Sequence, residues 1–187
     1  FLKEFLKYLF SDITGLFSTN KYYQMARQNQ SVGKETVFSY LEKIKESAYF
    51  SFLPVFSYSL KVQRVNPKKI ICLDNGLRRT AGFQFSPDLG KLMENLVGSL
   101  LMEANEEGQV FYWKNKHGVD FIVKKANTVK VVNVCFGGSL PEREIEGLLE
   151  FKKNFPRTKE LLLLSSDLRE KAKRVDTIPL WQWLISP

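Results

Sequence analysis

Residues 110–136, VFYWKNKHGVDFIVKKANTVKVVNVCF, decide the fold because they predict three successive β-strands separated by polar turns. The middle strand holds a lone acid, Asp120. Upstream, the stretch GKLMENLVGSLLMEA at 90–104 predicts an amphipathic helix that carries Glu94. The residues expected on its inward face are Leu92, Leu96, Leu100 and Leu101. A helix carboxylate and a strand carboxylate are therefore expected to face each other.

The chain downstream of these strands completes an α/β domain over residues 74–187. Pro141 begins a predicted helix that ends near Asn154 and carries acidic residues in its first turns. The apolar run LLLL at 161–164 predicts a strand buried on both faces. The tail at 178–185, with Trp181 and Trp183, alternates and is expected to pack against the sheet.

The first 73 residues predict three helices followed by a two-stranded ribbon, which is the order of a winged helix. The helices are expected at 1–17, near 18–28 and through the stretch that holds Val37 to Ala48. The ribbon strands are expected at 49–60 and 69–73, separated by the turn at Asn66 and Pro67.

The charge of this N-terminal part suggests an anionic partner. Residues 1–70 hold 11 Lys/Arg against 5 Asp/Glu, while the whole chain has a net charge of +8. The outer face of the third helix presents Glu35, Glu42 and Glu46, which would oppose DNA phosphates and disfavour major-groove reading. Contact with phosphates, without sequence specificity, is instead expected from the ribbon residues Lys61, Arg64, Lys68 and Lys69. A winged helix used as a protein-docking platform is the alternative.

The remaining composition is that of a globular domain with 44% hydrophobic and 26% charged residues. No apolar run approaches the roughly 18 residues that a membrane span needs. Cys72 and Cys135 lie in apolar strand-like runs and predict buried free thiols in a reducing, cytoplasmic compartment. The chain does not begin with Met, so we expect it to be part of a longer protein.

Eight ordered segments carry a family resemblance: ETVFSYLEKI at 35–44, FSYS at 56–59, PKKIICLDNGL at 67–77, GKLMENLV at 90–97, YWKNKHGVDFIV at 112–123, VVNVCF at 131–136, REIEGLL at 143–149 and IPLWQWL at 178–184. With these residues the chain resembles the C-terminal region of archaeal and bacterial AAA-type P-loop ATPases. That region pairs a winged helix with a PD-(D/E)xK nuclease-like domain, a mixed sheet flanked by helices as in restriction endonucleases. The resemblance implies an ATPase module N-terminal to this chain. ATP would bind there, because no G-x-x-x-x-G-K-[ST] motif occurs in this sequence.

The resemblance also implies where a nuclease site would lie. Glu94 and Asp120 would hold Mg²⁺, and the next strand would supply an acid followed by a lysine, where this chain has Asn133 and Cys135. Such hydrolysis needs a metal held by oxygen ligands and a cation near the attacking water. Asn133 offers only a neutral oxygen, and Cys135 cannot replace the lysine. Lys124, an even number of residues beyond Asp120, is a candidate replacement on the same strand face.

Three functions follow from this incomplete set of ligands. The first is an accessory region of an ATPase that binds nucleic acid or a protein through a nuclease-like fold with a degenerate site. The second is a Mg²⁺-dependent DNA endonuclease with a weakened site. The third is a protein-interaction or homo-oligomerisation platform, which would apply if the basic ribbon is covered in an assembly.

Overall fold

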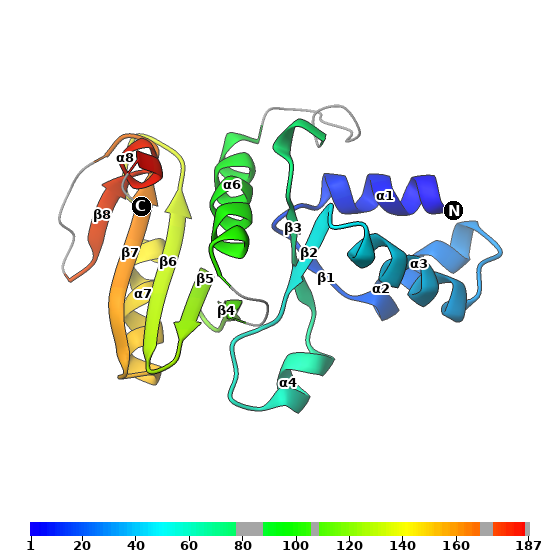
Figure 1. The fold of residues 1–187 in the computed structure, drawn as a ribbon, viewed down its shortest axis with the longest axis horizontal. Coiled ribbons are helices and arrows are strands. Elements are labelled where there is room, and N and C mark those ends of the chain that lie inside the picture. The colour runs from blue at the N-terminus through cyan, green and yellow to red at the C-terminus, as the bar shows by residue number, and fades with distance from the viewer. Residues whose placement is uncertain (78–87, 106–108, 169–173, 186–187) are drawn as a thin grey trace.

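The computed structural model describes residues 1–77, 88–105, 109–168 and 174–185, and it contains two sheet-based units (Figure 1). The N-terminal unit has a three-stranded sheet beside helices, and the C-terminal unit has a five-stranded sheet. One helix, α6 (Leu89–Glu103), lies between the two sheets and contacts both. This helix carries Glu94, so the candidate site lies where the two units meet.

The N-terminal unit is built from the three predicted helices and an antiparallel sheet in the order β1-β3-β2. Its core is rich in aromatic residues, with Phe5 and Tyr22 stacked at 4.2 Å between ring centroids. Its elements are α1 (Leu2–Ser11), β1 (Leu16–Phe17), α2 (Thr19–Asn29), α3 (Lys34–Glu46), β2 (Phe50–Leu53), α4 (Leu60–Val65) and β3 (Lys68–Cys72).

The ribbon departs from the expected pair of long strands. Strand β2 ends at Leu53 because Pro54 has no amide hydrogen to continue a ladder. The following segment crosses to the C-terminal sheet, where Val55 pairs in parallel with Tyr112. The amide of Phe56 donates to the Tyr112 carbonyl at 2.7 Å, and the Phe56 ring enters the core beneath helix α7 (Glu142–Asn154). The chain then forms α4, capped by the Ser59 hydroxyl, before it returns as β3.

The C-terminal unit has a mixed sheet in the order β4-β5-β6-β7-β8, antiparallel from β4 to β6 and parallel from β6 to β8. Helices α6 and α7 cover opposite faces. The three strands expected at 110–136, the helix after Pro141 and the buried strand at 161–164 are confirmed. The elements after α6 are β4 (Val110–Lys114), β5 (Gly118–Lys125), β6 (Thr128–Cys135), α7 (Glu142–Asn154), β7 (Thr158–Ser165), β8 (Asp176–Pro179) and α8 (Leu180–Ile185).

The tail does not alternate as expected. It pairs with β7 only as far as Pro179 and then turns into α8. Trp183 packs against the core beneath α6, whereas Trp181 is 57% exposed. Both cysteines are buried and free, as the sequence predicts. No helix among the described residues is long and apolar enough to cross a membrane.

The two units share packing through strand β3. Ile70 and Cys72 point into the N-terminal core, while Ile71 points into the core beneath α6. The buried Asn95 side chain of α6 accepts from the Cys72 amide at 2.8 Å and donates to the Cys72 carbonyl at 2.7 Å. Because strand side chains alternate, Lys69 is directed to the same side as Ile71, towards α6.

Helix α7 touches the start of β5 closely enough that a methyl group at Gly147 has no room. A Cβ there would lie 2.3 Å from the backbone carbonyl oxygen of Gly118. We expect Gly147→Ala to lower the free energy of unfolding by about 1–3 kcal/mol, as overpacking does, despite the better helix propensity of alanine. Urea denaturation measures this change. Gly138→Ala is the matched control, since nothing lies within 4 Å of its Cβ position. Equal stabilities of the two variants would contradict the prediction.

Candidate functional site

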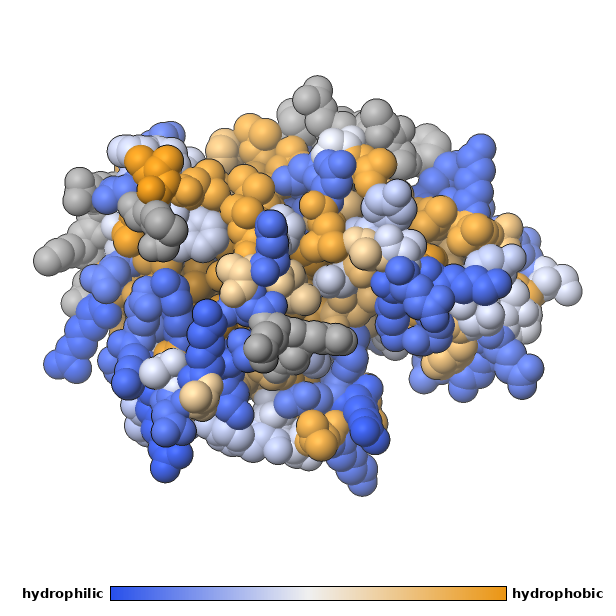
Figure 2. All heavy atoms as spheres, viewed as in Figure 1, coloured by the Kyte–Doolittle hydropathy of each residue, from blue (hydrophilic) through white to orange (hydrophobic). Residues whose placement is uncertain are grey.

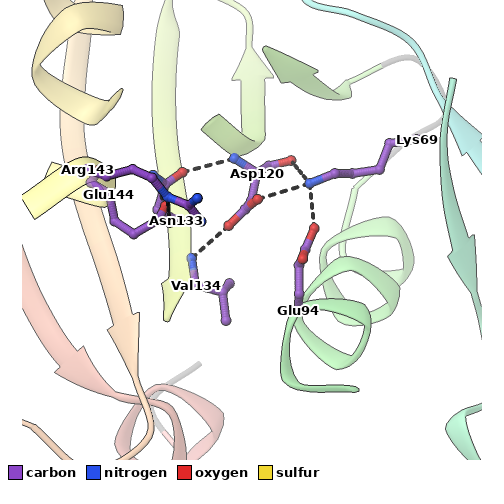
Figure 3. Close-up of polar contacts among 7 residues, drawn as sticks. All are labelled: Lys69, Glu94, Asp120, Asn133, Val134, Arg143 and Glu144. Atoms are coloured by element: carbon purple, nitrogen blue, oxygen red, sulfur yellow. Dashed lines mark hydrogen bonds and ion pairs between the residues drawn. The ribbon is translucent and has the colours of Figure 1, made fainter. Parts of the chain in front are cut away.

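The buried Lys69 and the partly buried Glu94 and Asp120 form an ion triad between the two units (Figure 3). The Nζ atom of Lys69 lies 2.5 Å from Glu94 Oε1 and 3.1 Å from Asp120 Oδ1, and it donates to the Asp120 carbonyl at 3.2 Å. Lys69 is only 6% exposed. One residue comes from β3, one from α6 and one from β5, so the triad connects three elements from both units.

A β-bulge in β5 directs Asp120 into this triad. Phe111 pairs with Ile122 and Trp113 pairs with Val119, so β5 holds one more residue than β4 over this interval. The extra residue places Asp120 and its neighbour Phe121 on the same face. Lys69 Nζ contacts both of them, since it also lies 4.9 Å from the centroid of the Phe121 ring.

Asn133 supports Asp120 from the opposite side of the sheet. The backbone pairing of β5 with β6 ends at Phe121 and Val132. Beyond this pair, the side chains of Asn133 and Asp120 bond to backbone amides of the neighbouring strand. The Asp120 amide donates to Asn133 Oδ1 at 2.9 Å, and the Val134 amide donates to Asp120 Oδ2 at 3.0 Å. The Asn133 amide group donates to the Glu144 carbonyl at 3.0 Å and to Glu144 Oε2 at 2.9 Å. Asn133 is fully buried, so its side chain bonds to Asp120 of β5 and Glu144 of α7 rather than to solvent.

Burial and an excess of carboxylates set the electrostatics of the site. Burial alone would lower the pKa of Lys69, but the Asp120 and Glu94 carboxylates outweigh it and raise that pKa above its usual value. Burial and the charge of Asp120 raise the pKa of Glu94 to about 7. Burial and Asp120 also raise the pKa of Glu144. Burial, Glu144 and Asp120 raise the pKa of the Cys135 thiol to about 11, so Cys135 stays protonated and unreactive at neutral pH.

The raised pKa of Glu94 predicts that stability decreases as pH rises from about 5 to about 7. In this window the folded protein retains a proton that the unfolded chain has released, so the folded state binds more protons and loses stability with pH. We expect the free energy of unfolding to fall by about 1–3 kcal/mol and then to level off. Urea denaturation across this range tests it, with Glu94→Gln expected to show a smaller fall. An unchanged fall in that variant would contradict the assignment to Glu94.

The residues of the site do not fit Mg²⁺. The Lys69 ammonium lies between the two carboxylates where a dication would bind, and Asp120 Oδ2 already accepts from Val134. Asn133 Oδ1, the neutral oxygen that the sequence offered in place of an acid, accepts from the Asp120 amide, and the side chain packs towards α7. No group of three His, Cys, Asp or Glu residues within the described ranges could hold a metal ion.

The expectation that Lys124 shares a face with Asp120 is wrong. The bulge shifts the alternation by one residue, which places Lys124 on the face of α7. There its Nζ lies 5.8 Å from the centroid of the Tyr58 ring, which packs on Phe155 just after α7.

The four basic residues that were expected to contact phosphates differ in exposure. Lys61 and Arg64 are exposed on α4, and Lys68 is partly buried and donates to the Gln63 carbonyl. By sequence, Lys69 was grouped with these three residues. Lys69 is instead buried in the triad, so the prediction that Lys69 contacts phosphate is wrong. The alternation of β3 could have indicated this, since Lys69 and Ile71 must face the same side. No sequence signal indicated that Glu144 would bind Asn133.

Comparison with known proteins places the C-terminal unit in a family. Residues 89–183 match a domain of unknown function, DUF4143. An uncharacterized protein of Methanocaldococcus jannaschii is 24% identical over 172 residues, which cover 84% of this chain and 38% of that protein. An uncharacterized protein of Haemophilus influenzae is 24% identical over 192 residues, which cover 98% of this chain and 46% of that protein.

The chain thus spans less than half the length of these curated relatives. No solved structure matches it. The family match covers α6, the five-stranded sheet and α7, so it includes Glu94, Asp120 and Asn133 but not Lys69. Because the match spans just over half of the 187 residues, the chain belongs to the family of the DUF4143 domain.

Proposed function

We propose that this chain is a non-catalytic accessory region of a larger protein, built on a nuclease-like scaffold whose carboxylate pair is neutralised by a lysine. The observation that carries this proposal is the Lys69 ammonium between Glu94 and Asp120. A dication held by these carboxylates would have to displace a buried, ion-paired lysine, which is costly because the ammonium would lose both partners. The triad therefore favours a structural role, in which it holds the two units together.

The element order supports the winged-helix and nuclease-like parts of the proposal. Helices α1 to α3, with a sheet ordered β1-β3-β2, follow the order of a winged helix. The order α6, three antiparallel strands, α7 and a parallel strand agrees with the resemblance to PD-(D/E)xK domains. In this proposal the site is a degenerate relic of such a nuclease.

The larger protein is proposed to be a cytoplasmic ATPase of the AAA type. The relatives are more than twice as long as the segment that they share with this chain, which leaves room for a further module. The resemblance of the C-terminal region suggests that this module is the P-loop ATPase and that ATP binds there. The buried free thiols agree with a reducing compartment.

A cleavage assay on the full-length protein tests the non-catalytic assignment. We expect no cleavage of plasmid or single-stranded DNA above background in Mg²⁺ or Mn²⁺, and no heat of metal binding in calorimetry. Asp120→Asn is the control for contaminating nucleases, because it removes the central carboxylate of the site. Metal-dependent cleavage that is lost in this variant would overturn the proposal and establish the endonuclease alternative.

A further inference from the structure

A groove of about 900 Å³ separates α3 from α4 and runs along strand β2. Figure 2 shows the surface hollowed between the lobe of α4 and the helices of the N-terminal unit. One wall carries Phe38, Glu42 and Lys45 of α3, and the other carries Arg64 and Val65 at the end of α4. None of the three triad residues lines this groove, so it is distinct from the triad.

The charge of the groove is positive. Lys45 pairs with Glu42 at 2.7 Å, which neutralises one cation. Arg64 and Lys68 have no carboxylate within ion-pair distance among the described residues. Burial and the charge of Lys45 lower the pKa of Lys68, as expected where cations gather without a counterion. An acidic ligand would supply the missing negative charge.

The walls also expose apolar side chains, which favours a protein over a nucleic acid. Helix α4 has no buried residue, and Val65 is 73% exposed. Phe38 is 40% exposed at the opposite wall. Aliphatic side chains find a counterpart in a peptide but none in a phosphate backbone. Lys34 Nζ lies 5.7 Å from the Phe38 centroid, which hinders stacking of a base on that side of the ring.

The floor of the groove favours an extended ligand. Five consecutive residues, 50–54, line it, whereas a strand seen from one face would contribute only alternate residues. Strand β2 is the outermost strand of its sheet, and within the described part of the chain it pairs only with β3. The groove therefore follows an open strand edge, where a second strand can add main-chain hydrogen bonds.

We propose that this groove binds an extended segment of a partner protein in which acidic and apolar residues alternate. The acidic side chains would point towards α4 and pair with Arg64 and Lys68, and the apolar side chains, on the other face of the extended segment, would contact Phe38 on the α3 wall. This inference rests on the proposed accessory role and names the class of partner that such a region would bind.

Charge reversal on α4 provides a matched test. Arg64 lines the groove, whereas Lys61 is exposed on the same helix and does not line it. The probes are fluorescein-labelled synthetic peptides of alternating valine and glutamate, the same peptides with lysine in place of glutamate, and labelled oligothymidylate. Their binding to the full-length protein is measured by fluorescence anisotropy. We expect the acidic peptides to bind at least tenfold more tightly than the basic ones.

The variants separate groove binding from general electrostatic attraction. Arg64→Glu is expected to weaken binding of the acidic peptide at least tenfold, and Lys61→Glu less than about twofold, with unchanged circular dichroism in both. Equal losses in the two variants, absence of preference for the acidic peptide, or tighter binding of oligothymidylate would each overturn the inference. The cleavage assay with Asp120→Asn is independent of this groove, so failure here leaves the non-catalytic assignment intact.

Discussion

Replacement of Lys69 by methionine is expected to lower the free energy of unfolding by about 3–5 kcal/mol at pH 7.5. Methionine keeps an unbranched chain of similar length, so the change removes the charge and leaves most of the packing. Glu94 and Asp120 would then be two partly buried carboxylates without a cation, and they would lose hydrogen bonds of 2.5 Å and 3.1 Å, respectively. Urea denaturation of the purified variant measures the loss.

The pH dependence of that loss identifies its cause. At pH 5 the carboxyl groups of the variant can take up protons, so the difference from wild type should shrink. The matched control is Lys130→Met, which breaks the partly exposed pair of Lys130 with Glu160 at 2.7 Å. Surface pairs contribute about 0–1 kcal/mol, and we expect that range here. A Lys69→Met variant as stable as the Lys130→Met variant would contradict the structural role of the triad.

A shorter side chain at position 69 tests whether the Lys69 ammonium occupies a position where a metal ion could bind between Glu94 and Asp120. Lys69→Ala opens space between two carboxylates that face each other from α6 and β5. Mn²⁺ is then expected to raise the melting temperature of this variant and to leave that of the wild-type protein unchanged. A variant that does not respond to Mn²⁺ would argue against a metal-binding ancestry of the site.

The local pattern of the sequence predicts the C-terminal sheet well. The apolar runs at 110–136 and 161–164 correspond to β4, β5, β6 and β7, because strands of a half-covered or buried sheet need such residues. Asp120 lies in the middle strand as expected. The interior partner of that acid could not be predicted, because Lys69 comes from a strand of the other unit and meets Asp120 only through the packing of α6.

The buried face of α6 and the bulge at Asp120 were also not predicted, because each depends on tertiary packing. The inward face expected of α6 assumes one covered side, but this helix lies between two sheets. It therefore buries Met93, Asn95 and Val97, while Leu92, Leu96 and Leu100 are only partly buried. The bulge at Asp120 reverses the alternation beyond it, so a prediction based on even spacing placed Lys124 on the wrong face.

The second large effect is expected at Asn133, which connects β5, β6 and α7. Asn133→Ala would leave the Asp120 amide without its acceptor and Glu144 without the donor to its carbonyl and carboxylate. Each buried group left unsatisfied costs about 1–3 kcal/mol, and the removed side chain leaves a cavity. We expect a loss of about 2–4 kcal/mol in urea denaturation. The control Asn154→Ala removes one exposed bond to the Glu150 carbonyl and should cost less than about 0.5 kcal/mol.

Hydrogen exchange shows whether that loss arises where the structure places it. In the wild-type protein the Asp120 amide is held by the Asn133 side chain, and the Val134 amide by the Asp120 carboxylate. These two amides should exchange faster in Asn133→Ala, while those at the centre of β7 keep their protection relative to global stability. Asn133→Asp retains an acceptor for the Asp120 amide but sets a second carboxylate against Glu144 Oε2, 2.9 Å from the present donor. That variant should therefore lose more stability than the wild-type protein between pH 5 and pH 8, because a shared proton relieves the repulsion only at the lower pH. Unchanged exchange at Asp120 in the alanine variant would show that Asn133 does not hold the bulge in place.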